Sequence, residues 1–235
     1  MPAEFKLGKR LNANRGIRNM LSFAEEIMLL LLEDEEGRFI HVPELSMRCV
    51  LSGAVLLELA LKNKIDTDLE KLEVIDPEPL GDGLLDPVLK EIVESGKKGD
   101  ARYWVDRIAR NADGIRERAL RRLCEKGVLE SKDDKFLWVF RSRRYPIKDG
   151  DVDREVRHKI ISILYSDDIP DPEDIVMVLL VDACGIFKHL LSEREHRRFR
   201  DRIRQIREMD LLGQAVTKSV RHIEASLALA LHPPF

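Results

Sequence analysis

Cysteine is scarce in this sequence, with three residues among 235. Cys49, Cys124 and Cys184 each lie in an apolar, helix-like stretch rather than at the spacing of a metal or redox motif. This pattern predicts reduced thiols in the core of a cytosolic protein.

The longest apolar run, from Ile27 to Leu32, is far shorter than the roughly 20 residues that span a bilayer. The N-terminus also lacks the apolar region of a signal peptide. We therefore expect a cytoplasmic protein, for which any membrane contact is peripheral.

Signatures of catalysis and of cofactor or metal binding are missing as well. Residues 81–86, GDGLLD, contain Gly-x-Gly without a third glycine or a preceding buried strand, which favours a turn over a nucleotide site. There is no paired-histidine metal motif, nucleophile elbow or phosphate-loop lysine. The histidines are scattered: His41, His158, His189, His196, His222 and His232. We predict no catalytic residue, no metal site and no cofactor.

Neither sign of charge dominates the chain, which has 40 basic and 43 acidic residues. This balance argues against a protein that coats nucleic acid. The charges are segregated, however. Residues 1–19 hold five basic residues and one acidic, residues 66–94 hold ten acidic and two basic, and residues 192–207 hold seven arginines. Local basic patches can therefore meet anionic partners.

Most of the chain has the apolar spacing of helices. Residues 1–19 contain little that could be buried, so we predict a flexible basic tail there and one domain over residues 20–235. The expected fold is mainly α, a single multi-helix globular domain around a central buried helix, with peripheral β-hairpins.

Local signals place the first elements. Ser22 and Glu25 have the spacing of a capping box, so a helix should start at this point. A second helix should begin near Pro43. Residues 64–86 mix short alternating stretches with proline and glycine, which predicts a small hairpin and a loop. A short helix from Pro87 to Glu94 should follow.

The second half reads as further helices. Residues 101–147 predict a helix, a break, a helix and a hairpin turning at Lys132 to Lys135, an order that resembles a winged-helix unit. Residues 175–184 are apolar on nearly every side, which indicates the central helix. A final helix should run to about His232. In the arginine-rich segment, one face carries apolar residues at spacings of 4 and 3: Phe199, Ile203 and Ile206.

The stretch IRERALRRLCEKGVLE, residues 115–130, places arginines around an apolar helix face. Each helical residue turns by about 100°. One broad face should be buried: Ile115, Ala119, Leu120, Leu123 and Cys124. Arg118, Arg121 and Arg122 lie opposite and are typical of a solvated face, where they can pair with Glu117 and Glu125.

Arg116 differs from these arginines because the same rotation places it between Leu120 and Leu123, on the apolar side. An arginine at such a position needs an anionic partner or a route to water. Two interpretations remain open. Arg116 forms a salt bridge or lays its stem along the rim of the core, or it lines an anion pocket.

Four stretches occur in a familiar order: LSFAEEIMLLLLEDEEG, LSGAVLLELALKNKI, GDGLLDPVLKEI and IRERALRRLCEKGVLE. Together they resemble the Golgi phosphoprotein 3 family, over most of the chain from about Leu21. The resemblance implies a mainly helical domain without catalytic activity that attaches peripherally to membranes by binding phosphatidylinositol 4-phosphate. In eukaryotic members it also implies a Golgi adaptor that retains glycosylation enzymes.

The family's lipid pocket uses a tryptophan, an arginine of the second helix and two arginines three apart. Of these, only the last arginine matches, as Arg116. The tryptophan falls near Pro43, the second-helix arginine at Ser52 and the other arginine near Asp113. Arg48 lies four residues before Ser52, on the same helical face, and could replace the missing charge. The candidate headgroup residues are therefore Arg116, Arg48 and Ser52.

The link between Lys64 and Gly81 is short and acidic where eukaryotic members carry a longer basic insertion. The chain thus looks like a divergent branch of prokaryotic type, whose ligand would be another anionic lipid or a phosphorylated molecule. The expected partner is an anionic phospholipid membrane surface, and the basic tail would add roughly 1 kcal/mol of attraction per charge. A protein cargo and a homo-oligomer are further partners that the sequence leaves open.

Nucleic acid is the alternative partner, less favoured. In this interpretation the helix from Ile115 to Lys126 enters a groove, while hairpin arginines up to Arg144 contact backbone phosphates. The wide apolar face of the helix and its interleaved acidic residues argue against it.

Overall fold

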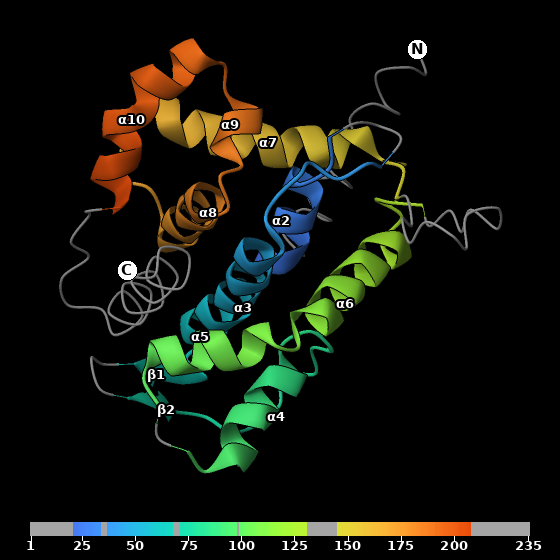
Figure 1. Ribbon diagram of the computed structural model, residues 1–235, viewed down its shortest axis with the longest axis vertical. Coiled ribbons are helices and arrows are strands. Elements are labelled where there is room, and N and C mark those ends of the chain that lie inside the picture. Colours follow the sequence, from blue (N-terminus) through green and yellow to red (C-terminus); the bar gives the residue numbers. More distant parts are fainter. Residues whose placement is uncertain (1–20, 34–36, 68–70, 98, 131–144, 208–235) are drawn as a thin grey trace, which may run out of the picture.

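The computed structural model describes residues 21–33, 37–67, 71–97, 99–130 and 145–207. In this part of the chain the fold is helical apart from one small hairpin, which confirms the predicted fold class (Figure 1). The first elements are α2 (Phe23–Leu30), α3 (Glu44–Leu61), β1 (Ile65–Thr67), β2 (Leu72–Val74), α4 (Asp86–Ser95), α5 (Ala101–Ala109) and α6 (Ala112–Glu125). The remaining elements are α7 (Gly150–Tyr165), α8 (Pro172–Ala183), α9 (Phe187–Leu190) and α10 (Glu193–Arg207).

Local sequence signals explain where several elements begin. The backbone N–H of Glu25 donates to Ser22 Oγ at 3.3 Å, and the N–H of Ser22 donates to Glu25 Oε2 at 2.7 Å, which confirms the capping box of α2. Pro43 precedes α3, as predicted. The hairpin pairs Ile65 with Val74 in antiparallel register.

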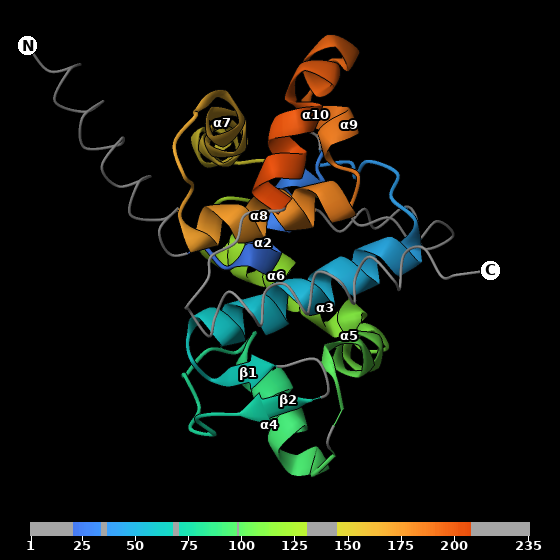
Figure 2. The ribbon, with the colours of Figure 1, turned by 90° about the vertical axis from the view of Figure 1, so that its left-hand side faces the viewer.

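The core is built around α2 and α3. All eight residues of α2 are buried, and the helix packs against α3, α6, α7 and α8. Helix α3 lies between α8 and α5 (Figure 2) and contacts both. No helix among the described residues is long and apolar enough to cross a membrane.

The sequence analysis predicted residues 175–184, which overlap α8, as the central helix of the fold. The structure confirms that this segment is buried but places it to one side of the centre. Ile175 to Val181 are all buried, as the continuous apolar pattern predicted. However, α8 packs on α3, α10, α7 and α2, on one side of the α2–α3 pair, while α6 and α5 cover the other side. The more central segments are α2 and α3, because short-range spacing cannot distinguish one buried helix from another.

Other predictions have mixed outcomes. Phe199, Ile203 and Ile206 of α10 are buried at 4%, 5% and 1% exposure, as expected. Cys49 and Cys184 are free and buried, whereas Cys124 is only half-buried. The predicted basic tail, the hairpin turning at Lys132 to Lys135 and the final helix lie outside the described residues.

Candidate functional site

Arg116 projects from the first half of α6 and lies over an aromatic ring. It is half-buried, and its guanidinium carbon lies 5.0 Å from the centroid of the Phe39 ring. Within the described residues, Arg116 forms no hydrogen bond or ion pair with a carboxylate. Stacking on Phe39 places the arginine stem at the core's rim. The charged N–H groups are then available to a ligand.

A glycine turn positions Phe39. Gly37 has φ +78°, and a Cβ there would lie 2.1 Å from the backbone carbon of Tyr145. The close approach lets the N–H of Tyr145 donate to the carbonyl oxygen of Gly37 at 3.3 Å. Phe39 then pairs with Leu32 in an isolated bridge, and its ring meets the Tyr145 ring edge-on at 6.1 Å. The aromatic surface under Arg116 is therefore fixed from two sides.

Arg48 of α3 lies beside the first turn of α6, where it forms ion pairs with two carboxylates. Its Nε donates to Glu44 Oε1 at 2.9 Å and its Nη2 donates to Asp113 Oδ2 at 2.8 Å. The hydrogen bond to Glu44, and next the charge of Asp113, raise the pKa of Arg48. Asp113 and Arg116 are three residues apart and share a face of α6. The ion pair with Asp113 thus places Arg48 beside the first turn of α6, and a joint role of Arg48 and Arg116 in headgroup binding stays a prediction.

Ser52 is not brought to this surface. Its residue exposure is 0%, and its hydroxyl donates to the carbonyl oxygen of Arg48, one turn earlier in α3, at 2.9 Å. The hydroxyl therefore supports the backbone that carries Arg48. Direct contact of Ser52 with a headgroup stays a prediction.

Arg116, Phe39, Arg48 and Asp113 form what we call the Arg116 site. Glu44, which pairs with Arg48, adjoins this site. The two arginines and the two carboxylates, Asp113 and Glu44, balance each other in formal charge. This set can bind an anion through Arg116, while Arg48 becomes available only when its carboxylate partners release it. Phe39 was missed by sequence reasoning, although an aromatic residue just after a glycine turn was the signal for it.

A second cluster corrects the prediction for Arg122. Glu25 is fully buried, and Lys126 Nζ lies 2.6 Å from its Oε1. Arg122 approaches Glu25 Oε1 at 3.4 Å and donates from Nη1 to Asp82 Oδ1 at 2.6 Å. Arg122 is thus half-buried in an ion-pair network rather than solvated beside Glu117. It is unavailable to a nucleic-acid backbone, and the hairpin of that alternative lies outside the described residues.

Asp82 joins this network to the start of α4. It accepts hydrogen bonds from the N–H groups of Leu84 and Leu85 at 2.7 and 3.1 Å. Burial acts to raise the pKa of Asp82, but these hydrogen bonds and Arg122 outweigh it and lower the pKa. The motif GDGLLD is therefore a structural turn, as the sequence analysis favoured.

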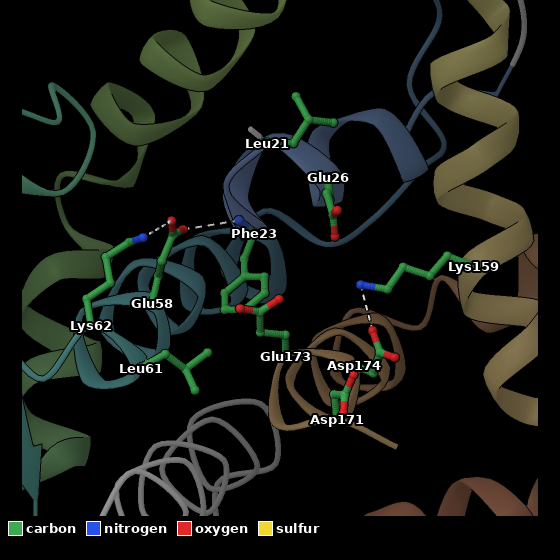
Figure 3. A pocket seen from close by; sticks show the side chains of 10 residues that line it. All are labelled: Leu21, Phe23, Glu26, Glu58, Leu61, Lys62, Lys159, Asp171, Glu173 and Asp174. Carbon is green, nitrogen blue, oxygen red and sulfur yellow. Dashed lines mark hydrogen bonds and ion pairs between the residues drawn. The ribbon is translucent and has the colours of Figure 1, made fainter. Parts of the chain in front are cut away.

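A cavity of about 500 Å³ opens at the start of α2, between α3 and α8 (Figure 3). Glu58 Oε2 accepts from the Phe23 N–H at 3.1 Å, and Lys159 pairs with Asp174 at 2.6 Å. Burial raises the pKa of Glu58 to about 7. Among the described residues, no group of three potential metal ligands forms a site.

Comparison with known proteins decides the family. A family model described as Golgi phosphoprotein 3 (GPP34) matches residues 23–223. The chain belongs to the Golgi phosphoprotein 3 family. This match confirms the resemblance carried by the four sequence stretches, and it spans every described element from α2 to α10.

Two curated relatives in the family are fungal. The vacuolar protein sorting-associated protein 74 of Schizosaccharomyces pombe is 26% identical over 175 residues, which are 66% of this chain and 51% of the relative. The protein of the same name from Eremothecium gossypii is 26% identical over 191 residues, 72% of this chain and 56% of the relative. This chain thus spans about half the length of these two relatives.

Proposed function

We propose that this chain is a non-catalytic, peripheral membrane-binding protein that holds an anionic phospholipid headgroup at the Arg116 site. The observation that carries the proposal is a half-buried arginine, stacked 5.0 Å above Phe39, with no anionic partner among the described residues. A guanidinium in this setting forms charge-assisted, bidentate hydrogen bonds with phosphate oxygens. Family membership supports the same position, because the resemblance assigns Arg116 to headgroup phosphate.

Phosphatidylinositol 4-phosphate is the headgroup that the family resemblance implies. The site has one aromatic and one arginine without a directly paired carboxylate, fewer groups than the family pocket, so the expected preference for this headgroup is weaker. Lys6, Lys9, Arg10, Arg15 and Arg18 add general attraction to an anionic leaflet. An adaptor role that links a protein cargo to the cytoplasmic membrane surface belongs to the same proposal.

Co-sedimentation with liposomes tests the proposal. Wild type, Arg116→Ala and Arg121→Ala are compared on neutral vesicles, generic anionic vesicles and vesicles with phosphatidylinositol 4-phosphate, at low and physiological salt. Arg121 is the matched control because it is exposed on the same helix. We expect headgroup-dependent binding that Arg116→Ala reduces by about tenfold, the value of one charge-assisted hydrogen bond.

Two results would count against the proposal. Binding that follows vesicle charge but ignores both headgroup and Arg116 would assign the membrane contact to the basic tail alone. Absence of binding to every vesicle would remove the lipid function from this family member.

A further inference from the structure

A second cavity lies between α4, the end of α5 and the start of α6. Its volume is about 440 Å³, within the usual range for small-molecule sites. We call it the α4–α6 cavity. Its polar lining comes from Glu91, Arg110, Asn111, Asp113 and Arg118. Arg116 does not line it.

The two carboxylates of this cavity form ion pairs with arginines that do not line it. Glu91 accepts a hydrogen bond from Nε of Arg107 at 2.8 Å. Asp113 is held by Arg48 at 2.8 Å. Neither Arg107 nor Arg48 lines the cavity, so the acidic charge of the lining is already compensated.

The two arginines of the cavity have no such partner. Within the described residues, the side chains of Arg110 and Arg118 form no ion pair or hydrogen bond. Arg110 is exposed, whereas Arg118 is half-buried and its Nε is fully buried without a hydrogen-bond acceptor. A buried guanidinium N–H without an acceptor is costly. The cavity lining therefore carries two arginine side chains without a counter-charge.

Gly114 leaves the space in which Arg118 lies. A Cβ at position 114 would stand 3.3 Å from Nη1 of Arg118 and 3.7 Å from Nη2. The guanidinium is thus folded against the first turn of α6. Asn111, just before the helix, makes no side-chain capping bond. The N-terminal end of the helix dipole adds partial positive charge beside the arginine.

From these contacts we propose that the α4–α6 cavity is a second anion site, which binds a phosphate group through Arg118 and Arg110. The apolar wall, formed by Pro87, Val88, Ile108 and Ile115, would contact a small organic group esterified to that phosphate. Inorganic phosphate, a soluble phosphate monoester and a phosphomonoester headgroup share this chemistry. This site uses Arg118 and Arg110 in place of Arg116, and the two sites adjoin at Asp113.

Calorimetric titration of the full chain with inorganic phosphate and with glycerol phosphate tests this proposal at physiological salt. Wild type is compared with Arg118→Gln, Arg110→Gln, Arg116→Ala and the control Arg121→Gln. We expect Arg118→Gln to weaken binding at least tenfold, and Arg110→Gln severalfold, since each removes charge-assisted hydrogen bonds. Arg116→Ala and Arg121→Gln should bind like wild type. Arg110 is exposed, so its variant keeps the test valid even if Arg118→Gln unfolds.

Vesicles with phosphatidic acid separate the two sources of phosphate. Binding of the soluble esters with no Arg118-dependent vesicle binding would support a soluble ligand, and Arg118-dependent vesicle binding would support a headgroup. Three results would overturn the proposal. These are no binding to any probe at millimolar concentration, equal binding by wild type and both cavity variants, or loss of phosphate binding in Arg116→Ala alone.

Discussion

Nη2 of Arg48 lies 2.8 Å from Oδ2 of Asp113, so an ion pair joins α3 and α6 beside Arg116. The pair brings a carboxylate to the surface where we propose that a phosphate binds. Asp113→Asn should remove that repulsion and leave Arg48 with Glu44 as its remaining carboxylate partner. We expect the affinity for anionic vesicles to rise about fivefold at low salt, the effect of one charge a few ångströms away in water.

Co-sedimentation of Asp113→Asn with anionic vesicles measures this gain. Glu193→Gln is the control, because it makes the same charge change on α10, where Glu193 is 94% exposed. An equal gain in both variants would mean that only net charge matters and would contradict a local role for Asp113.

Arg122→Ala should destabilise the protein because it leaves the buried Glu25 carboxylate with Lys126 as its main charged partner. We expect the free energy of unfolding to fall by about 2 to 3 kcal/mol. Urea unfolding measures it, with the exposed Arg121→Ala as control, expected to change stability by less than about 0.5 kcal/mol. Adding Glu25→Gln should recover part of the loss. Equal effects of Arg122→Ala and Arg121→Ala would show that the network contributes little.

Glu58 should make stability depend on pH. Burial raises its pKa from 4.5 to about 7. The unfolded chain therefore loses this proton near pH 4.5, while the folded chain keeps it until about pH 7. The free energy of unfolding should fall as pH rises through this window, by at most about 3 kcal/mol.

Urea unfolding of wild type and Glu58→Gln between pH 5 and 8 tests this dependence. The glutamine can still accept from the Phe23 N–H, so the difference between the two proteins should grow as pH rises. Glu173→Gln, an exposed change in the same cavity, should follow wild type. Parallel curves for wild type and Glu58→Gln would rule out a raised pKa at this residue.

Gly37 and Gly127 form a matched pair of turn glycines, with φ of +78° and +73°. Gly127→Ala meets no atom within 4 Å, so it should cost only backbone strain, about 1 to 2 kcal/mol. Gly37→Ala adds a clash with the backbone of Tyr145 and should lower the melting temperature considerably more. It should also displace Phe39. Similar melting temperatures would mean that the segment around Gly37 moves away readily.

Local spacing allowed much of the fold to be predicted. The capping box of Ser22 and Glu25 marked α2, and the 4 and 3 spacing of Phe199, Ile203 and Ile206 marked the buried face of α10. These signals lie within one or two helical turns, where geometry links sequence to structure directly. The order of the buried helices depends on contacts between distant segments, so α8 was placed too centrally.

In the candidate site, too, local spacing predicted some residues and missed those that come from distant segments. Rotation about the helix axis placed Arg116 on the apolar side of α6, and the structure agrees. Phe39 beneath it comes from a separate turn, which no spacing within α6 reveals. Arg122 was assigned to solvent because its partner Asp82 lies 40 residues away. The pair of Lys126 and Glu25, 101 residues apart, was not predicted for the same reason.

Binding of the free headgroup shows whether Arg116 holds a headgroup phosphate. Inositol 1,4-bisphosphate is titrated by calorimetry into wild type, Arg116→Ala and Arg121→Ala at physiological salt. We predict that Arg116→Ala weakens binding about tenfold or more while Arg121→Ala leaves it unchanged. Equal affinity of all three proteins, or no binding by wild type, would contradict the claim.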